Sequence, residues 1–295
     1  MRAIFRGENV MSIRAYAAPV TALIVLLAAD AGLSAPANPW TVVSVRELRA
    51  GEVPFEEASR YLWPSTDANN VPGPDSLVAH VRTDEKYHAY IELEDLRTGK
   101  VLPLLKANAC LPQWSPDGKY IACSVWKSPR QNGQLTVVDV ATRTVILDPG
   151  VDGITTKWSP DSRTLLAEGL TYSSQRLMLY TISVPDGRAM VLDTIDVSAD
   201  YEFSWSPDGR WIAFSRPTKV DYEDATLAAD LWIADAKTGT TWLVLETPDW
   251  VESNPLWITN RTIQVDRVHW DRTEAGVEQS VVIELSRKDS PGKED

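Results

Sequence analysis

The sequence predicts an all-β protein, a β-propeller of four-stranded antiparallel blades, and three observations support this prediction. A turn phrase, Trp-Ser-Pro-Asp followed by Gly or Ser, begins at Trp114, Trp158 and Trp205. The copies lie 44 and 47 residues apart, which is the length of one propeller blade. Between the copies, apolar β-type runs alternate with polar loops and show no helical period.

Each phrase has the composition of a tight turn between two strands. Pro presets φ at the first central position, Asp suits the second, and Gly adopts the left-handed conformation after it. An apolar run follows, Tyr120–Cys123 in the first copy and Trp211–Phe214 in the third. The phrase therefore predicts a hairpin tip. The same turn chemistry explains the repeated Asp117, Asp161 and Asp208 without a catalytic role.

Weaker copies of the phrase extend the repeat at both ends. Trp63 lies 51 residues before the first full copy, and Trp257 lies 52 residues after the last. We interpret Trp63, Trp114, Trp158, Trp205 and Trp257 as a structural repeat, because a buried aromatic side chain contributes roughly 150–250 Å² of packing area. The repeat predicts five blades, and an incomplete sixth blade built from leftover strands is the alternative.

The two ends of the repeat region predict how the propeller closes. Thr41–Val45 resembles Thr136–Val140, and each segment begins 22 residues before a repeated Trp. The region therefore opens on an outer strand, while the last strand, Val281–Leu285, lacks a following fourth strand. Joining the ends in one blade supplies the missing strand and removes exposed sheet edges. We expect a propeller over residues 40–286, closed by its N-terminal strand.

The N-terminal segment has the pattern of a secretory signal peptide. Three Arg precede the apolar stretch Ala17–Ala29, and two Ala-x-Ala cleavage signals follow. We predict a signal peptide over residues 1–31, starting at Met1 or Met11, and a linker over residues 32–39. The apolar stretch is shorter than the roughly 20 residues of an uncleaved membrane anchor. The protein is therefore expected to be periplasmic or extracellular, with a charged, disordered tail at residues 287–295.

Composition excludes several classes of function. The net charge is −12 and the pI is about 4.8, which argues against a nucleic-acid partner. Two Cys and three His argue against a zinc site, and we expect no metal and no cofactor. The sequence contains no Gly-x-Ser-x-Gly, P-loop or dinucleotide fingerprint. No catalytic residue is predicted.

The two cysteines flank the first full phrase. Cys110 lies four residues before Trp114, and Cys123 lies five residues after Gly118. A two-residue turn would place them opposite each other, whereas a bulge would make them diagonal. Export permits a disulfide. The sequence leaves a disulfide and two buried thiols as equal alternatives.

The sharpest binding hypothesis is an acidic loop face. Three loops of neighbouring blades are expected on one face of the propeller, and carboxylates with two aromatic side chains gather in them. These residues are Asp196, Asp200, Asp221, Tyr222, Glu223, Asp224, Asp249, Trp250 and Glu252. Such a surface suits a basic or cationic partner or Ca²⁺ with its oxygen ligands. Ordinary solvated loops are the alternative reading.

The phrase followed by an apolar strand resembles the WD-like propeller repeats of the TolB type, which also occur in the propeller domains of prolyl oligopeptidases. The resemblance is strong in three copies, residues 114–126, 158–169 and 205–215. It implies a periplasmic propeller that docks protein partners through one face. The absence of Gly-x-Ser-x-Gly leaves no sign of the hydrolase domain of the oligopeptidases.

From these observations we expect an exported, non-enzymatic propeller that binds a protein or cell-envelope partner through its loop face. The partner is expected to be basic or cationic, and the mature chain is expected to have no membrane span. The alternative is a Ca²⁺-assisted propeller hydrolase of the lactonase kind. That function needs carboxylates and amides on the innermost strands, but Thr155–Lys157 and Tyr201–Phe203 show no repeated set of them.

Overall fold

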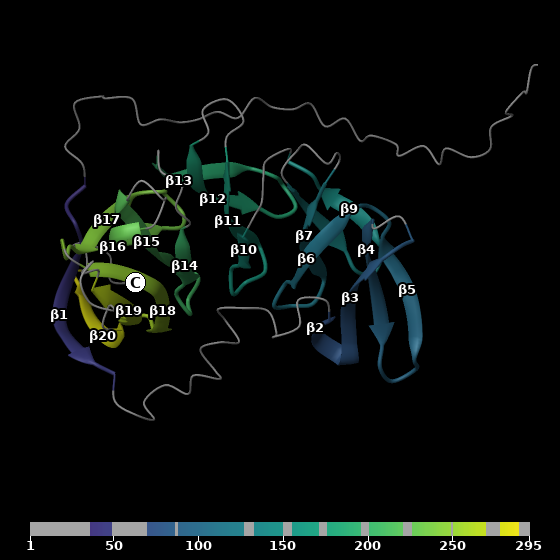
Figure 1. Cartoon of the computed structure of the whole chain (residues 1–295), viewed down its shortest axis with the longest axis horizontal. Coiled ribbons are helices and arrows are strands. Elements are labelled where there is room, and N and C mark those ends of the chain that lie inside the picture. Colours follow the sequence, from purple (N-terminus) through teal and green to yellow (C-terminus); the bar gives the residue numbers. More distant parts are fainter. Residues whose placement is uncertain are drawn as a thin grey trace, which may run out of the picture. The chain divides into compact units, whose positions relative to one another are not determined.

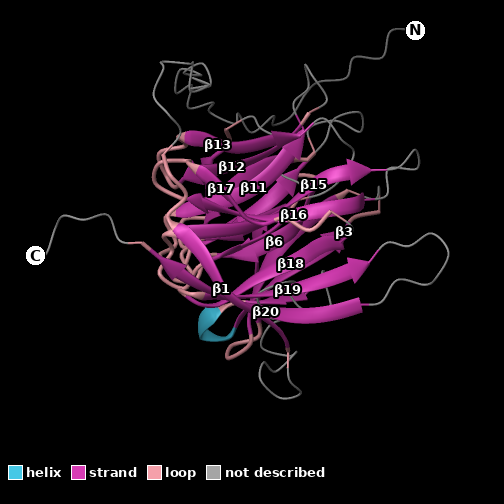
Figure 2. Cartoon of the chain, turned by 90° about the vertical axis from the view of Figure 1, so that its left-hand side faces the viewer, coloured by secondary structure: helices cyan, strands magenta, loops and turns pink. Residues whose placement is uncertain are grey.

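The computed structural model describes the chain after residue 35 in a series of stretches. These are residues 36–48, 70–85, 88–126, 133–149, 155–170, 176–195, 201–220, 226–248, 250–269 and 278–288. Every regular element in them is a β-strand except η1 (Pro74–Ser76), a turn of 3-10 helix (Figures 1 and 2). No helix among these residues has the length and apolar character needed to cross a membrane. The all-β prediction is confirmed.

Three sheets each contain four antiparallel strands that follow one another along the chain. The first unit is β2 (Asn70–Pro72), β3 (Leu77–Thr83), β4 (Ala89–Asp95) and β5 (Lys100–Leu105). The second unit is β6 (Ala109–Trp114), β7 (Tyr120–Val125), β8 (Gln134–Asp139) and β9 (Thr144–Leu147). The third unit is β10 (Thr155–Trp158), β11 (Thr164–Leu170), β12 (Leu177–Ser183) and β13 (Ala189–Ile195).

The remaining strands form one eight-stranded sheet that contains two further four-stranded units. The fourth unit is β14 (Glu202–Trp205), β15 (Trp211–Val220), β16 (Thr226–Asp235) and β17 (Thr241–Leu245). The fifth unit is β18 (Trp250–Thr259), β19 (Thr262–His269), β20 (Glu278–Arg287) and β1 (Trp40–Glu47). A single parallel pair, Ala229 with Val251, joins the two units. Four-stranded antiparallel units were the architecture that the repeat predicted.

The N-terminal strand pairs with the C-terminal strand. β1 runs antiparallel to β20, and Trp40 lies opposite Arg287. Trp40 is buried against Trp211 and Trp257, with ring centroids 5.0 and 5.9 Å away. β1 is thus the fourth strand of the fifth unit, next to β20. β20 also extends one residue into the predicted tail.

Each full phrase forms a turn whose side chains satisfy its own backbone. The Oγ of Ser115 donates to Oδ1 of Asp117 at 2.8 Å and accepts the amide N–H of Tyr120 at 3.0 Å. Oδ1 of Asp117 also accepts the amide N–H of Lys119 at 3.1 Å. The other two copies repeat all three bonds. Gly118 has a φ of 71°, the left-handed conformation that the phrase requires.

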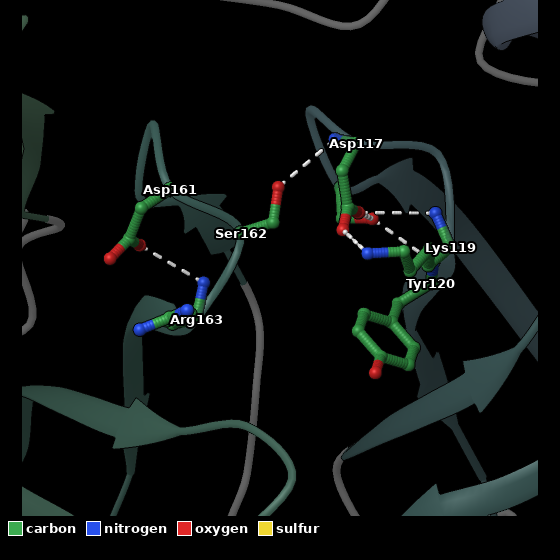
Figure 3. A network of polar contacts seen from close by, with 7 residues as sticks. Asp117, Lys119, Tyr120, Asp161, Ser162 and Arg163 are labelled. Atoms are coloured by element: carbon green, nitrogen blue, oxygen red, sulfur yellow. Dashed lines mark hydrogen bonds and ion pairs between the residues drawn. The ribbon is translucent and has the colours of Figure 1, made fainter.

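Turns of neighbouring units are bonded to one another. Figure 3 shows the Oγ of Ser162, which accepts the amide N–H of Asp117 at 3.0 Å. Ser162 occupies the Gly position of its phrase, is buried and has a φ of 63°, which is less favourable for Ser than for Gly. Unlike Gly, it offers a hydroxyl that forms a hydrogen bond to the neighbouring unit. The Oδ1 of Asn260 accepts the amide N–H of Asp208 at 3.1 Å in the same way. These bonds join the turns of the second and third units and those of the fourth and fifth units.

The first unit contains a copy of the phrase without Trp. Pro72 pairs with Val78 at the register that Trp114 occupies in the second unit. Gly73–Ser76 then takes the place of Ser-Pro-Asp-Gly, and its last two residues have φ values of 55° and 65°. Trp63 lies outside the described residues, so its place in the structural repeat stays a prediction. The residue that holds the Trp position in this unit is Pro72.

Three of the repeated Trp side chains form a hydrogen bond to the unit before their own. In three of them the indole N–H donates to a carbonyl on the first strand of the preceding unit. The pairs are Trp114 with Val71 at 3.1 Å, Trp158 with Gln113 at 3.1 Å and Trp205 with Lys157 at 3.2 Å. The indole N–H of Trp257 has no partner among the described residues. Buried apolar clusters lie between successive units and complete the packing.

The two cysteines are free thiols in the structure. A bulge between Cys110 and Gln113 places Cys110 opposite Ser124, so the two thiols do not face each other across the hairpin. Burial raises the pKa of Cys110 to about 11. Burial, and then the neighbouring Cys110, raise the pKa of Cys123 to about 12. Cys110 and Cys123 are therefore two thiols in the structure and do not form a disulfide.

Candidate functional site

Polar side chains from three successive units meet on the first strands of those units. Lys157 lies on β10, Glu202 on β14 and Asn254 on β18. The Nζ of Lys157 donates to the carbonyl of Phe203 at 2.5 Å, which joins the third unit to the fourth. The amide N–H of Asn254 donates to Oε2 of Glu202 at 2.6 Å, which joins the fourth unit to the fifth.

A β-bulge aims the backbone of Asn254 at the neighbouring unit. The pairing of β18 with β19 shifts between Ser253 and Leu256, and Asn254 has a φ of 47°. Asn tolerates this left-handed conformation better than most residues. The bulge coincides with Pro255, which cannot donate to the strand ladder. Bulges often redirect groups at binding sites, and here the redirected amide holds a carboxylate.

A second carboxylate lies beside Asn254. The Nδ2 of Asn254 donates to Oδ2 of Asp266 on β19 at 3.4 Å. The Oγ of Ser280 donates to Oδ1 of the same Asp266 at 2.5 Å. Both oxygens of Asp266 are therefore held in place. We call Lys157, Glu202, Asn254 and Asp266 the first-strand site.

The environment of Lys157 is unusual for a lysine. Burial lowers the pKa of Lys157 to about 8, although the negative charges of Glu202 and Glu168 oppose the shift. The Nζ lies 5.2 Å from the centre of the Phe203 ring. A partly buried ammonium with a perturbed pKa is a mark of functional sites. Both protonation states of Lys157 are accessible near neutral pH.

A hydrogen-bond network next to the site holds Glu168, whose charge acts on Lys157. Glu168 is buried, and its Oε2 accepts the amide N–H of Tyr201 at 2.9 Å. The hydroxyl of Tyr201 donates to Oδ2 of Asp193 at 2.9 Å, and the Nε of Arg216 donates to the same oxygen at 2.6 Å. Burial, then the charge of Asp193 and the bond to it, raise the pKa of Tyr201. The phenol therefore remains a proton donor.

The charge balance of the site is negative. The charges of Glu202 and Glu168 act on the ammonium of Lys157, and Asp266 adds a further carboxylate beside Asn254. When Lys157 loses its proton, the net negative charge of the site increases. A bound cation would find oxygen acceptors and be attracted by these carboxylates, whereas an anion would be repelled by them. The described residues contain no group of three His, Cys, Asp or Glu side chains arranged for a metal ion.

The titration of Lys157 is directly measurable. In lysine ¹³Cε spectra we expect one resonance to titrate near pH 8 and to be absent from Lys157→Met. The unfolded chain keeps this proton up to a pKa near 10.5. Between these values the unfolded state binds more protons, so the free energy of unfolding of the wild type should rise with pH relative to the variant. If the Lys157 resonance titrates at the same pH as the exposed lysines of the chain, its pKa is not lowered by burial.

The predicted acidic loop face lies largely outside the described residues. Among its nine residues the structure describes only Trp250 and Glu252. Glu252 lies within strand β18 and is fully buried, so its expected role as an exposed loop carboxylate is wrong. Arg267 lies opposite it on β19 and pairs with its Oε1 at 3.0 Å, while Thr247 donates to the same oxygen at 2.5 Å. This ion pair explains how the carboxylate can be buried.

The site was missed because its members do not recur at one position of the repeat. Lys157 immediately precedes its Trp, whereas Glu202 and Asn254 stand three residues before theirs. The sequence does carry a signal for the bulge, because a Pro stands two residues before a repeated Trp at Pro255 and also at Pro112. Both Pro residues lie within bulges.

Comparison with known proteins gives information on the fold. No family model matches the chain, and no curated protein matches its sequence. A structure of two prolyl endopeptidases has a TM-score of 0.52 at 16% identity over 76% of this chain. The β-propeller domain of the Trilobed protease from Pyrococcus furiosus has 19% identity, a TM-score of 0.46 and 68% coverage. TolB from Acinetobacter baumannii has 15% identity, a TM-score of 0.39 and 74% coverage.

With its repeated four-stranded units, the chain has a β-propeller fold. This chain spans 67% of the Trilobed protease domain, 66% of TolB and 37% of the prolyl endopeptidase. The similarity at these identities concerns the fold alone. It nonetheless overturns the expectation of a non-enzymatic interaction module, because the similar structures include prolyl endopeptidases. A propeller with these repeats gives no ground for excluding catalysis.

Proposed function

We propose that the chain is an exported propeller with TolB-like repeats whose first-strand site binds a small cationic ligand. The observation that carries the proposal is the chain of contacts from Lys157 through Glu202 and Asn254 to Asp266. Two bonds between units hold these groups in one place. The carboxylates outnumber the ammonium, and all four side chains are only partly buried, so solvent reaches them.

The proposal includes five blades closed into a ring by β1. Five first strands, β2, β6, β10, β14 and β18, support the blade number. The pairing of β1 with β20 supports the closure. The repeated turn bonds support the TolB-like assignment, and the signal pattern of residues 1–31 supports export.

Calorimetry with two probes of similar length tests the ligand class. Putrescine carries two ammonium groups and succinate carries two carboxylates. We expect putrescine to bind the wild type and succinate not to bind, because the site has excess negative charge. Glu202→Gln should weaken putrescine binding by about tenfold, since it removes a charge that the ligand contacts.

Glu284→Gln is the matched control, because Glu284 is an exposed carboxylate on β20 outside the first-strand site. This variant should bind putrescine as the wild type does. Equal weakening in both variants would show a general effect of net charge and would defeat the proposal. Preference for succinate would defeat it as well.

A further inference from the structure

The amine of Lys157 is held against the strand that carries Glu202. Its Nζ donates to the carbonyl of Phe203 at 2.5 Å, and the carbonyl of Lys157 accepts the indole N–H of Trp205 at 3.2 Å. Side chain and backbone of Lys157 are therefore both bonded to β14, on which Glu202 lies. In its charged form, Lys157 is a cation built into the first-strand site.

The charges of two carboxylates act on this amine from neighbouring strands. Lys157 lies opposite Leu166 on β11, and Glu168 stands two residues further along that strand, on the same face of the sheet. Glu168 and Glu202 both favour the charged amine. On the other side, β6 contacts β10 and has no charged residue between Ala109 and Trp114. A ligand cation that is attracted by Glu202 must therefore compete with the ammonium of Lys157.

The neutral amine of Lys157 also suits this position. A neutral amine keeps two N–H groups, so it can still donate to the carbonyl of Phe203 after it loses a proton. The loss exposes a lone pair, which can accept a hydrogen bond from a ligand ammonium. The ring of Phe203, whose centre lies 5.2 Å from Nζ, is an apolar neighbour that makes the neutral form less costly. Deprotonation therefore changes Lys157 from a competitor into an acceptor.

The carboxylate of Glu202 keeps its anchor in both states of Lys157. Its Oε2 accepts the amide N–H of Asn254 at 2.6 Å, and this bond joins the fourth unit to the fifth. A backbone amide does not titrate, so the bond persists when Lys157 becomes neutral. The negative charge of Glu202 is then no longer offset by the ammonium, and it attracts a ligand cation more strongly.

We propose that Lys157 is an internal competitor of the cationic ligand, which binds the first-strand site only after the amine of Lys157 has released its proton. Two ammonium groups beside one carboxylate repel each other, whereas a neutral amine does not repel the ligand. One proton leaves Nζ for the solvent as one ligand enters. The inference rests on the proposed function and adds its regulation, because the affinity must then increase with pH.

Calorimetry of putrescine binding in two buffers of different ionisation enthalpy, PIPES and ACES, counts the protons released. Because burial lowers the pKa of Lys157 to about 8, most of this amine is charged at pH 7. We expect the wild type to release about one proton for each putrescine bound at pH 7. The association constant should rise about tenfold from pH 6 to pH 7 and about fivefold from pH 7 to pH 8, following the neutral fraction of Lys157.

Two Lys variants identify the group that releases the proton. Lys157→Met should release none and should bind putrescine equally at pH 6 and pH 7. Lys237→Met is the matched control, because Lys237 is exposed on the turn after β16 and its replacement removes the same charge. This control should release the proton as the wild type does. If Lys157→Met does not fold, the proton count of the wild type still decides.

The outcomes distinguish this inference from the proposed function. Putrescine binding with the same heat in both buffers would overturn the internal competitor and leave the cationic ligand in place. Proton release that persists in Lys157→Met would overturn it as well, because another group would then be responsible. Absence of putrescine binding throughout pH 6 to pH 8 would overturn both.

Discussion

Replacing Arg267 with Met is expected to lower the free energy of unfolding by about 3–5 kcal/mol, the usual cost of breaking a buried ion pair from one side. The Nη2 and Nε of Arg267 both lie 3.0 Å from Oε1 of Glu252. The Glu252 side chain is 0% exposed, and its Oε2 has no hydrogen-bond partner among the described residues. The variant would leave a carboxylate in the interior with only Thr247 as a donor.

The loss should depend on pH in a defined direction. Burial already raises the pKa of Glu252, and the positive charge of Arg267 opposes that shift. Removing Arg267 raises the folded-state pKa further, so the variant holds a proton that the unfolded chain releases. The destabilisation is therefore greatest above the folded-state pKa of Glu252 in the variant, and it decreases as the pH falls through that pKa and Glu252 becomes protonated in the folded protein.

Urea denaturation of wild type and variant at pH 7 and pH 5 measures both effects. Arg97→Met is the matched control, because Arg97 pairs with Asp95 at 3.4 Å and its side chain is 66% exposed. Exposed pairs of this kind contribute about 0–1 kcal/mol. If Arg267→Met costs no more than the control, or if its cost does not fall on acidification, the account of Glu252 is wrong.

The architecture could be predicted because the turn phrase is a local structure. The bonds of Ser115, Asp117 and their equivalents lie within six residues, so their chemistry is readable from the sequence alone. The first unit shows the limit of this reading. Its phrase, Gly73–Ser76, keeps Pro and Asp but follows Pro72 in place of Trp. The fifth unit shows the converse, because it keeps Trp257 but has Thr259-Asn260 in place of Pro-Asp, so neither marker alone identifies every unit.

The candidate site could not be predicted, because it depends on contacts between units. Lys157 and Glu202 are 45 residues apart and occupy different positions of the repeat. A bulge, which the sequence marks only by Pro255, turns the amide of Asn254 toward Glu202. The acidic residues around Glu252 led to the prediction that it lies in an exposed loop. It lies instead within strand β18, and its side chain pairs with Arg267. Local composition cannot specify which side of such a strand is buried.

The second large effect is expected at the interface between the second and third units. Trp158 is 8% exposed, stacks on Tyr120 with centroids 6.1 Å apart, and donates its indole N–H to the carbonyl of Gln113 at 3.1 Å. Trp158→Ala should lower the free energy of unfolding by about 3–5 kcal/mol, because it opens a cavity and leaves that carbonyl without its donor.

A pair of Phe variants separates the hydrogen bond from the packing. Trp158→Phe loses ring volume and the bond to Gln113, whereas Trp257→Phe loses similar volume but no hydrogen bond to a described residue. Urea denaturation should therefore show Trp158→Phe to be the more destabilised of the two by about 1 kcal/mol, the net contribution of one hydrogen bond. If the two Phe variants are equally stable, the indole bonds between units contribute nothing, and the repeated Trp stabilises the propeller through buried area alone.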